Sequence, residues 1–328
     1  MTERIAVLLH NPVDPNARKD DLDLFEEMQA VEAALTTLGW KHTRIVFDTD
    51  IARVKRELDA VKAGVVFNLV ETLEGKGSHQ YLAPALLEHW GIKYTGGTAE
   101  SLFITTDKLL AKELLTLNRI PTPECFCPGR FEQLVPDARY IVKAVDEDAS
   151  LGMDAKSILT PSEGDDLAAF IRGKEKTHGV RFFAERFIEG REFNLTVLGM
   201  NGAPQILSPA EIRFINFGDK RPKIVDYRAK WEEKSFEYKN TQRSFDFPPE
   251  DAPLLARLGE LAGQCWRELR LAGYARVDFR VDEQGNPWVL EVNVNPCITH
   301  YGGVAAACER AGISYDTFVA RIVAEALR

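Results

Sequence analysis

The sequence predicts an α/β fold that opens with a parallel sheet. Strand-like apolar runs alternate with helix-spaced apolar residues over residues 5–90, as in parallel α/β units. Residues 64–70 form a mainly apolar run, which is typical of a strand buried on both faces. Strand-rich sequence follows residue 139, so a second part of α+β character is expected. A chain of 328 residues is long enough for two or three domains.

Three strands and three helices are expected in the first part. Apolar residues from Leu24 to Leu38 recur at helical spacing, and Gly39 ends that helix. Ligands of parallel sheets bind where the strands end, which makes residues 68–77 a candidate site loop. The expected strands are 5–9, 44–47 and 64–70, and the expected helices are 24–38, 51–63 and 79–90.

A boundary is expected at residues 94–98, where glycine and threonine cluster. The Thr-Thr-Asp segment at 105–107 caps a helix that runs to about Asn118, and the prolines of residues 120–123 stop it. The later strands are expected at 139–145, 181–187 and 192–198, and the later helices at 163–172, 252–271, 304–311 and 315–327.

A predicted hairpin at residues 274–296 is the most informative local pattern. Both of its strands alternate apolar and polar residues, and a turn-forming segment joins them. Residues two apart in a strand share a face, so Arg276 lies with Asp278, and Glu291 lies with Asn293. Asp, Glu and Asn offer the hard oxygen ligands that Mg²⁺ prefers when it also binds nucleotide phosphates. A solvated polar face explains the hairpin alone equally well.

Bulk composition argues against several functions. The net charge of −9 argues against a general nucleic-acid binder. No apolar run reaches the roughly 20 residues of a membrane helix, and residues 1–4 lack a signal-peptide pattern, so a cytoplasmic location is expected. The five cysteines lack framework spacing, which favours free thiols, and Cys125 and Cys127 lack the second pair of a zinc site.

Several segments are candidate phosphate sites. Residues 75–78 resemble a P-loop only superficially, because the upstream glycine is missing and the segment does not run from strand to helix. Lys108 lies in the first turn of a helix, where the dipole disfavours a cation unless a phosphate or Asp107 offsets it. Lys143 lies in an apolar strand and either reaches solvent or meets an anion. Backbone N–H groups of the Ser150–Gly152 loop suit a covering role over phosphates.

Glu185 and Glu192 flank a turn between two strands, an arrangement that suits nucleoside hydroxyl or amino donors but is also an ordinary charged hairpin.

Together and in this order, the hairpin, the candidate phosphate sites and this turn resemble the ATP-grasp superfamily, most closely its D-alanine–D-alanine ligase branch. The resemblance runs from about residue 64 to the C-terminus. Its matching segments are 91–96, 106–108, 120–123, 141–143, 185, 190–192, 227–230, 276–278, 291–296 and 311–314.

The resemblance implies a doubly wound N-terminal domain and a two-lobed ATP-grasp unit that holds ATP between two antiparallel sheets. The expected domains are 1–97 (N-terminal), 98–185 (small lobe, nucleotide clamp) and 186–328 (large lobe, metal and catalytic centre). The implied nucleotide contacts are with the phosphates (Lys108 and Lys143), the adenine amino group (Glu185) and the ribose (Glu192).

The resemblance also implies a metal and catalytic centre. Asp278, Glu291 and Asn293 would hold two Mg²⁺ ions, with Mn²⁺ as an alternative. Lys230 would approach the transferred phosphate, and Arg276 would stabilise charge on an acyl phosphate or tetrahedral intermediate. The chemistry agrees with this set, because phosphorylation turns a poor carboxylate electrophile into one that an amine can attack.

The positions that grip amino-acid substrates in this family are changed. Residues 10–18 contain no match to the family's glycine-rich loop with its Ser and Glu, and Val70-Glu71 replaces a His-Gly pair. A substrate-side serine falls at Ala149, and Trp231 replaces a tyrosine. Where the family has Pro-Gly-Met-Thr and, soon after, a serine, this chain has Pro-Cys-Ile-Thr-His-Tyr-Gly-Gly at residues 296–303.

Glu71, Trp231, Cys297 and His300 are therefore the candidate substrate residues. Glu71 either replaces the lost amine-gripping carboxylate or is a solvated loop acid. Cys297 is either a nucleophile or a plain small residue, and the absence of an upstream base favours the second interpretation. His300 either contacts substrate or lies on the rim.

The expected function is an ATP-dependent carboxylate–amine ligase that joins amino acids or small peptides through an acyl phosphate and releases ADP and phosphate. Nucleotide and metal positions persist while substrate positions change, so a different substrate pair is expected. A genuine D-alanine–D-alanine ligase and a non-catalytic ATP-binding protein are the alternatives. The expected partners are small-molecule amino acids or peptides, and binding to nucleic acid or to a membrane is not expected. A homodimer is a further alternative for the oligomeric state.

Overall fold

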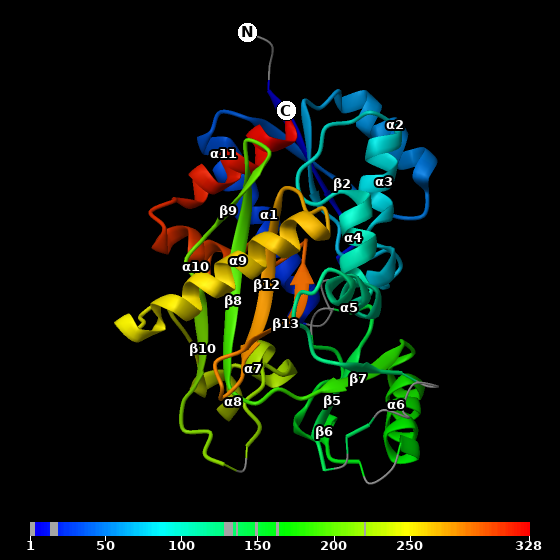
Figure 1. Cartoon of the computed structure of the whole chain (residues 1–328). Helices are drawn as coiled ribbons and strands as arrows, with labels where there is room; N and C mark the ends of the chain where they lie inside the picture. Colours follow the sequence, from blue (N-terminus) through cyan, green and yellow to red (C-terminus); the bar gives the residue numbers. More distant parts are fainter. Residues whose placement is uncertain are drawn as a thin grey trace.

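The structure is a computed structural model, and it describes residues 4–13, 19–127, 134–135, 137–147, 150–161, 164–219 and 221–328. Along the chain it contains a parallel sheet, a small antiparallel sheet and a large antiparallel sheet (Figure 1). In Figure 1 the parallel sheet lies at the top and the small sheet at the lower right. Among the helices of the described residues, none is long and apolar enough to cross a membrane.

The N-terminal sheet is parallel, as the sequence predicts, and helices cover both of its faces. Its elements are β1 (Ile5–His10), α1 (Lys19–Thr37), β2 (Lys41–Val46), α2 (Ile51–Val61), β3 (Val65–Leu69), η1 (Gly77–His79) and α3 (Leu82–His89). Ala6 and Leu8 pack toward α1 and the C-terminal helix α11 (Tyr315–Ala326). Val7 and Leu9 point the other way, toward α2 and α3. The predicted α/β class is therefore confirmed.

The small sheet is antiparallel, in the order β4–β7–β5–β6, and one helix covers one of its faces. Its elements are β4 (Cys125–Phe126), β5 (Tyr140–Ala144), η2 (Ala155–Ser157), β6 (Ile158–Leu159), α6 (Gly164–His178) and β7 (Phe182–Arg186). Tyr140 and Val142 pack with Leu167 of α6. Because side chains alternate along a strand, Ile141 and Lys143 face the opposite side, where both line a cavity.

The large sheet runs β11–β10–β8–β12–β13, with β9 beside β8. Its elements are β8 (Arg191–Met200), β9 (Ala203–Ile206), β10 (Ala210–Phe214), α7 (Tyr227–Trp231), α8 (Phe236–Asn240), β11 (Thr241–Ser244), η3 (Pro249–Asp251), α9 (Ala252–Glu268), β12 (Tyr274–Val281), β13 (Pro287–Asn293) and α10 (Gly303–Arg310). Val277 and Phe279 pack in the core beneath α9, while Arg276 and Asp278 line the cavity. The predicted hairpin and its alternation of faces are confirmed.

The helix expected to begin at residues 105–107 is present as α5 (Lys108–Leu117), and an additional short helix, α4 (Ala99–Thr106), precedes it. Thr98 caps α4, and Asp107 caps α5 by accepting the N–H groups of Leu109 and Leu110. The sequence does not predict α4, because this short helix begins within the glycine- and threonine-rich boundary segment. It also does not predict β9–β11, because they are short and the Thr-Gln-Arg-Ser run of β11 shows no apolar alternation.

Gly190 leads from β7 into β8 in a conformation that excludes other residues. Its φ is +138°, a region that L side chains rarely adopt. A Cβ at this position would lie 1.9 Å from the carbonyl oxygen of Val281. The close approach lets β8 begin beside the end of β12, where Glu192 lies opposite Arg280.

Candidate functional site

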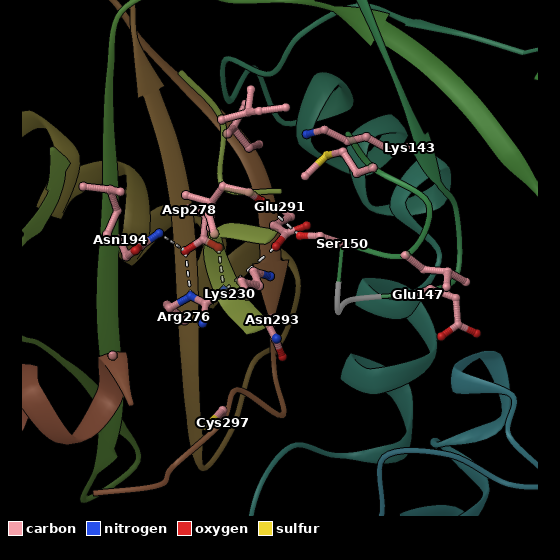
Figure 2. Close-up of a pocket in the computed structure, with 18 of the residues that line it drawn as sticks. Lys143, Glu147, Ser150, Asn194, Lys230, Arg276, Asp278, Glu291, Asn293 and Cys297 are labelled. Carbon is pink, nitrogen blue, oxygen red and sulfur yellow. Dashed lines mark hydrogen bonds and ion pairs between the residues drawn. The ribbon is translucent and has the colours of Figure 1, made fainter. Parts of the chain in front are cut away.

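A cavity of about 500 Å³ lies between the polar face of the large sheet and the small sheet (Figure 2). It brings together most of the residues that the sequence predicts for a site. The predicted residues that line it are Glu71, Lys108, Lys143, Ser150, Glu185, Glu192, Lys230, Trp231, Arg276, Asp278, Glu291, Asn293 and Cys297. Gly152 and His300 do not line it. Gly152 lies against the ring of His178, and His300 is exposed and packs on the ring of Tyr315.

The hairpin strands place two polar pairs side by side. Arg276 of β12 lies opposite Asn293 of β13, and Asp278 lies opposite Glu291. Arg276 donates two hydrogen bonds of 2.8 and 2.7 Å to the two oxygens of Asp278. The amide of Asn194 on β8 donates to the same carboxylate at 2.7 Å. Asp278 is thus oriented from two directions, as Figure 2 shows.

The two carboxylates of the hairpin have different electrostatic surroundings. Burial raises the pKa of Asp278, against the opposing charge of Arg276. Burial also acts on Glu291, but the surrounding cations, Lys108 first, outweigh it and lower its pKa to about 2. The oxygens of Glu291 lie 3.9 Å from Lys108 Nζ and 4.0 Å from Arg276 Nη2, which is too far for hydrogen bonds. Glu291 is therefore an ionised carboxylate surrounded by cations.

The donor set on the hairpin fits a divalent cation that also binds phosphate. The described residues contain no group of three or more His, Cys, Asp and Glu side chains able to hold a metal ion. Asp278, Glu291 and Asn293 instead supply two carboxylates and an amide around one part of the cavity. Mg²⁺ usually takes one or two carboxylates from the protein and completes its shell with phosphate and water. The residues present therefore fit magnesium better than a closed all-protein metal site.

Two lysines flank a buried carboxylate on the small-sheet side. Glu185 is 1% exposed, and its Oε1 lies 2.6 Å from Lys143 Nζ. Its Oε2 lies 2.8 Å from Lys112 Nζ, an ion pair without hydrogen-bond alignment. Burial opposes ionisation, but the charges of Lys112 and Lys143 lower the pKa of Glu185 overall. One carboxylate between two ammonium groups leaves a net positive charge, which favours an anionic ligand here.

Glu192 on β8 is held by Arg280 on β12. Arg280 Nη2 lies 2.8 Å from Glu192 Oε2, and both side chains are buried. Burial raises the pKa of Glu192, and the charge of Arg280 opposes that rise. Arg280 also donates to the carbonyl oxygens of Gly190 (3.2 Å) and Lys223. The carboxylate therefore has a defined position in the cavity wall.

The loop over the cavity is tied to the two sides of the site. Lys108 at the start of α5 donates to the carbonyl oxygen of Glu147 at 2.7 Å. Ser150 has a positive φ of 60°, and its hydroxyl donates to the carbonyl oxygen of Val225 at 3.1 Å. Ala149, where the sequence places the family's substrate-side serine, lies outside the described residues. The loop thus reaches from α5 to the segment that precedes α7.

Helix α7 presents Lys230 and Trp231 to the cavity. Asp226 caps this helix by accepting the N–H of Ala229 at 2.8 Å. The indole Nε1 of Trp231 is buried and finds no hydrogen-bond acceptor among the described residues. A buried donor without a partner costs free energy, so an acceptor atom of a ligand or a water is expected at this position.

The turn after β13 contacts α1. Figure 2 shows Cys297 of this turn at the end of the pocket away from Lys143. Cys297 Sγ donates to Asp23 Oδ2 at 3.0 Å, and the Ile298 N–H donates to Glu27 Oε1 at 2.6 Å. Burial and the acids Glu27 and Asp23 raise the pKa of Cys297 well above its usual value. The thiolate is the nucleophilic form of cysteine, so this environment favours an inert neutral thiol.

Glu71 lies after β3, where ligands of parallel sheets are expected, and it lines the cavity. Its N–H donates to Asn11 Oδ1 at 3.0 Å. Residues 14–18, which belong to the stretch without a family match, lie outside the described residues. A second carboxylate, Asp23 of α1, lines the cavity as well.

Five lining or supporting residues escape the sequence reasoning. Lys112 follows Lys108 by one helical turn. Arg280 follows Asp278, and Asn194 follows Glu192, at strand spacing, so these three residues have a periodic signal. The other two have no local signal, because only the packing of distant segments brings them to the cavity. The five are Asp23, Lys112, Asn194, Arg243 and Arg280.

Comparisons with known proteins show which family this chain resembles along its length. Residues 135–324 match the family model described as D-ala D-ala ligase C-terminus. A D-alanine–D-alanine ligase of Moorella thermoacetica is 31% identical over 334 residues, which cover 99% of this chain and 99% of that protein. An uncharacterized protein of Sinorhizobium fredii is 28% identical over 265 residues, which cover 78% of this chain and 73% of that protein.

A solved structure has the same fold. The crystal structure of a D-alanine–D-alanine ligase from Bacillus anthracis, complexed with ATP, superimposes with a TM-score of 0.73 and 21% identity. The match covers 99% of this chain and 98% of that chain. At this identity the likeness concerns the fold alone.

Proposed function

Because this chain belongs to the D-alanine–D-alanine ligase family of ATP-grasp enzymes, we propose that it joins two amino acids or small peptides through an acyl phosphate. It is an ATP-dependent ligase that forms a peptide-type carbon–nitrogen bond. The resemblance predicted from the sequence motifs is thus confirmed. The observation that best supports the proposed chemistry is the shared face of Arg276, Asp278, Glu291 and Asn293 in the cavity.

We assign the small-sheet side of the cavity to ATP. Its phosphates would lie near Lys108, Lys143 and the loop at Ser150, and Glu185 and Glu192 would face the adenine amino group and the ribose. The net positive charge around Glu185 supports an anionic ligand there. Lys143, which lies 2.6 Å from Glu185, would then share its ammonium group between this carboxylate and a phosphate.

We assign Asp278, Glu291 and Asn293 to two Mg²⁺ ions, with Mn²⁺ as an alternative. When bound, the ions neutralise charge on the transferring phosphoryl group. Glu291 is ionised at neutral pH, because its pKa is about 2. Asp278 is already aimed by Arg276 and Asn194, so little reorganisation is needed when a cation binds.

The proposed reaction has two steps. An oxygen of the first substrate's carboxylate attacks the γ-phosphorus of ATP, the bond from that phosphorus to the β–γ bridging oxygen breaks, and ADP leaves. The amine of the second substrate then attacks the acyl carbon, loses a proton and expels phosphate. Lys230 would offset charge on the transferring phosphoryl group, and Arg276 would offset charge on the tetrahedral oxyanion.

A D-alanine–D-alanine ligase in the strict sense is the second candidate. The 31% identity over the full length with an enzyme of that name favours it. The altered residues Trp231 and Cys297, both at the cavity wall, instead favour a different substrate pair. Dipeptide formation from D-alanine alone distinguishes the two candidates.

Purified protein with ATP, Mg²⁺ and a panel of amino acids and dipeptides is expected to release ADP for at least one pair. Glu291→Ala is expected to lower this turnover roughly 100-fold or more, because it removes a metal ligand. Glu260→Ala serves as the control, since Glu260 is an exposed acid of α9 outside the cavity. Full activity of Glu291→Ala would contradict the metal assignment. ATP binding without ADP release on the whole panel would favour the non-catalytic alternative.

Three further expectations stay predictions. They are the domain limits 1–97, 98–185 and 186–328, a cytoplasmic location and a homodimer. Limited proteolysis with mass spectrometry tests the domain limits, because cleavage concentrates in exposed segments between domains. Analytical ultracentrifugation tests the oligomeric state.

A further inference from the structure

Arg243 is a cation of the cavity that the proposed chemistry does not use. It lies on β11, the edge strand of the large sheet, opposite Ile212 of β10. Both residues line the cavity, and the Arg243 side chain is exposed. Because Arg243 belongs to none of the buried clusters of the core, its replacement removes no core packing.

Among the residues that the structure describes, Arg243 has no acidic partner, unlike other arginines of this sheet. Arg213, Arg276 and Arg280 each lie within 3.3 Å of a carboxylate oxygen. In the part of the chain that the structure describes, Arg243 has no ion pair, and its hydrogen bond to the carbonyl oxygen of Tyr301 is long, at 3.4 Å. Although the side chain reaches solvent, its guanidinium is partly desolvated in the cavity wall, and this desolvation and repulsion from Arg276 lower the pKa of Arg243. An anion beside this guanidinium would relieve both effects.

A glycine turn leaves space beside Arg243. Gly303 is the first residue of α10, and a Cβ placed on it would lie 3.6 Å from Arg243 Nη2 and 4.0 Å from Arg276 Cδ. The side chains of both arginines therefore approach the start of α10, in the turn that also contains Cys297. Figure 2 shows Cys297 at the end of the pocket away from Lys143, so this space is distant from the side assigned to ATP.

We propose that Arg243 binds a carboxylate of the amine substrate and selects acceptors that carry one. The inference rests on the proposed ligase function. A guanidinium presents paired N–H donors that match the two oxygens of a carboxylate. The neighbouring Arg276 is assigned to the tetrahedral oxyanion, so an acceptor held by Arg243 has its amine on the side of the reacting carbon. The acceptor is then an amino acid or a peptide with a free carboxylate, rather than a simple amine or an amide.

The test compares acids with amides as acceptors. D-alanine, L-alanine and glycine are each offered beside the matching amide, and ADP release is measured at varied acceptor concentration. Arg243→Gln is expected to lower kcat/KM for the acids roughly 10- to 100-fold more than for the amides, since only the acids lose a charge-assisted pair. Arg213→Gln is the control, because Arg213 is exposed and pairs with Glu211 outside the cavity. It is expected to keep the wild-type acid-to-amide ratio.

An acid-to-amide ratio that Arg243→Gln leaves unchanged would overturn the proposal, whether the two kinds of acceptor lose activity equally or not at all. Failure of the ligase function is recognised separately with hydroxylamine, a carboxylate-free amine that traps acyl phosphates as hydroxamates. Absence of hydroxamate from the wild type with every carboxylate of the panel would refute that function.

A binding measurement then tests the role of Arg243 independently of catalytic turnover. The same acids and amides are titrated calorimetrically into the protein loaded with a non-hydrolysable ATP analogue. A wild-type preference for the acids that disappears in Arg243→Gln supports the proposal. Equal affinity for acids and amides in the wild type, or a preference that the variant retains, overturns it.

Discussion

Replacing Glu27 by glutamine tests how the turn beyond the hairpin is held. Glu27 is 4% exposed on α1, and its Oε1 accepts the N–H of Ile298 at 2.6 Å. Burial is the main cause that raises its pKa from 4.5 to about 7, and the charge of Asp23 adds to the rise. The folded protein therefore binds this proton more tightly than the unfolded chain does.

The sign and the size of the effect follow from these two pKa values. Because the folded pKa lies above the unfolded one, the stabilisation from the proton is complete below pH 4.5 and is lost as the pH rises through 7. Each pKa unit corresponds to about 1.4 kcal/mol. Relative to its value below pH 4.5, the contribution of Glu27 to the free energy of unfolding is therefore lower by about 3 kcal/mol at pH 8. Glutamine keeps the acceptor for Ile298 and has no charge. Glu27→Gln should therefore exceed the wild type in stability by about 1 kcal/mol at pH 5 and about 3 kcal/mol at pH 8.

Urea unfolding at the two pH values measures this difference, and the other titrating groups cancel between the two proteins. Met28→Leu is the matched control, since Met28 is a buried neighbour on α1 without an ionisable group. Its change in stability should be the same at both pH values. A stability difference between Glu27→Gln and the wild type that stays constant with pH would refute the raised pKa, and one that is larger at pH 5 would refute the sign.

Two further substitutions and one alkylation reaction test the site and the strands that support it. Lys112→Met removes one partner of the buried Glu185 and should lower the free energy of unfolding by about 3–5 kcal/mol in urea, whereas a loss below about 1 kcal/mol would argue against that ion pair. Gly190→Ala would place a Cβ 1.9 Å from the carbonyl oxygen of Val281, so differential scanning calorimetry should show a melting temperature lower by roughly 5 °C or more. An unchanged melting temperature would rule out the close approach. Cys297 should react with iodoacetamide at pH 8 roughly ten times more slowly than a free thiol, as followed by mass spectrometry, because burial and nearby acids raise its pKa. Alkylation at the rate of a free thiol would contradict this environment.

The polar face of the hairpin could be predicted from sequence, because it depends on local geometry. Arg276 and Asp278 share a face by the two-residue period of a strand, and the same holds for Glu291 and Asn293. The turn between the strands then limits the register to a few choices. Alternation and a turn were therefore enough to predict that these four side chains lie together.

The surroundings of Glu185 could not be predicted in the same way. Lys143 reaches it because β5 pairs with β7, and Lys112 reaches it because α5 packs beside the same strands. These partners are separated from Glu185 by 42 and 73 positions in the sequence, and no local pattern specifies a contact at that range. The sequence suggested a nucleoside contact for Glu185, but the ion pairs that set its charge depend on strand pairing and helix packing.

The sequence by itself determined the fold class, the order of the motifs and the face of the two hairpin strands on which polar residues lie. These features follow from periodicity and from turn and cap residues, which act over a few positions. The tertiary structure alone decided that Arg243 has no ion pair among the described residues and that Glu27 is buried beneath Ile298, 271 positions away. Burial and charge pairing depend on which distant surfaces meet, so the pKa values and the unpaired cation of this site arise only when the chain is folded.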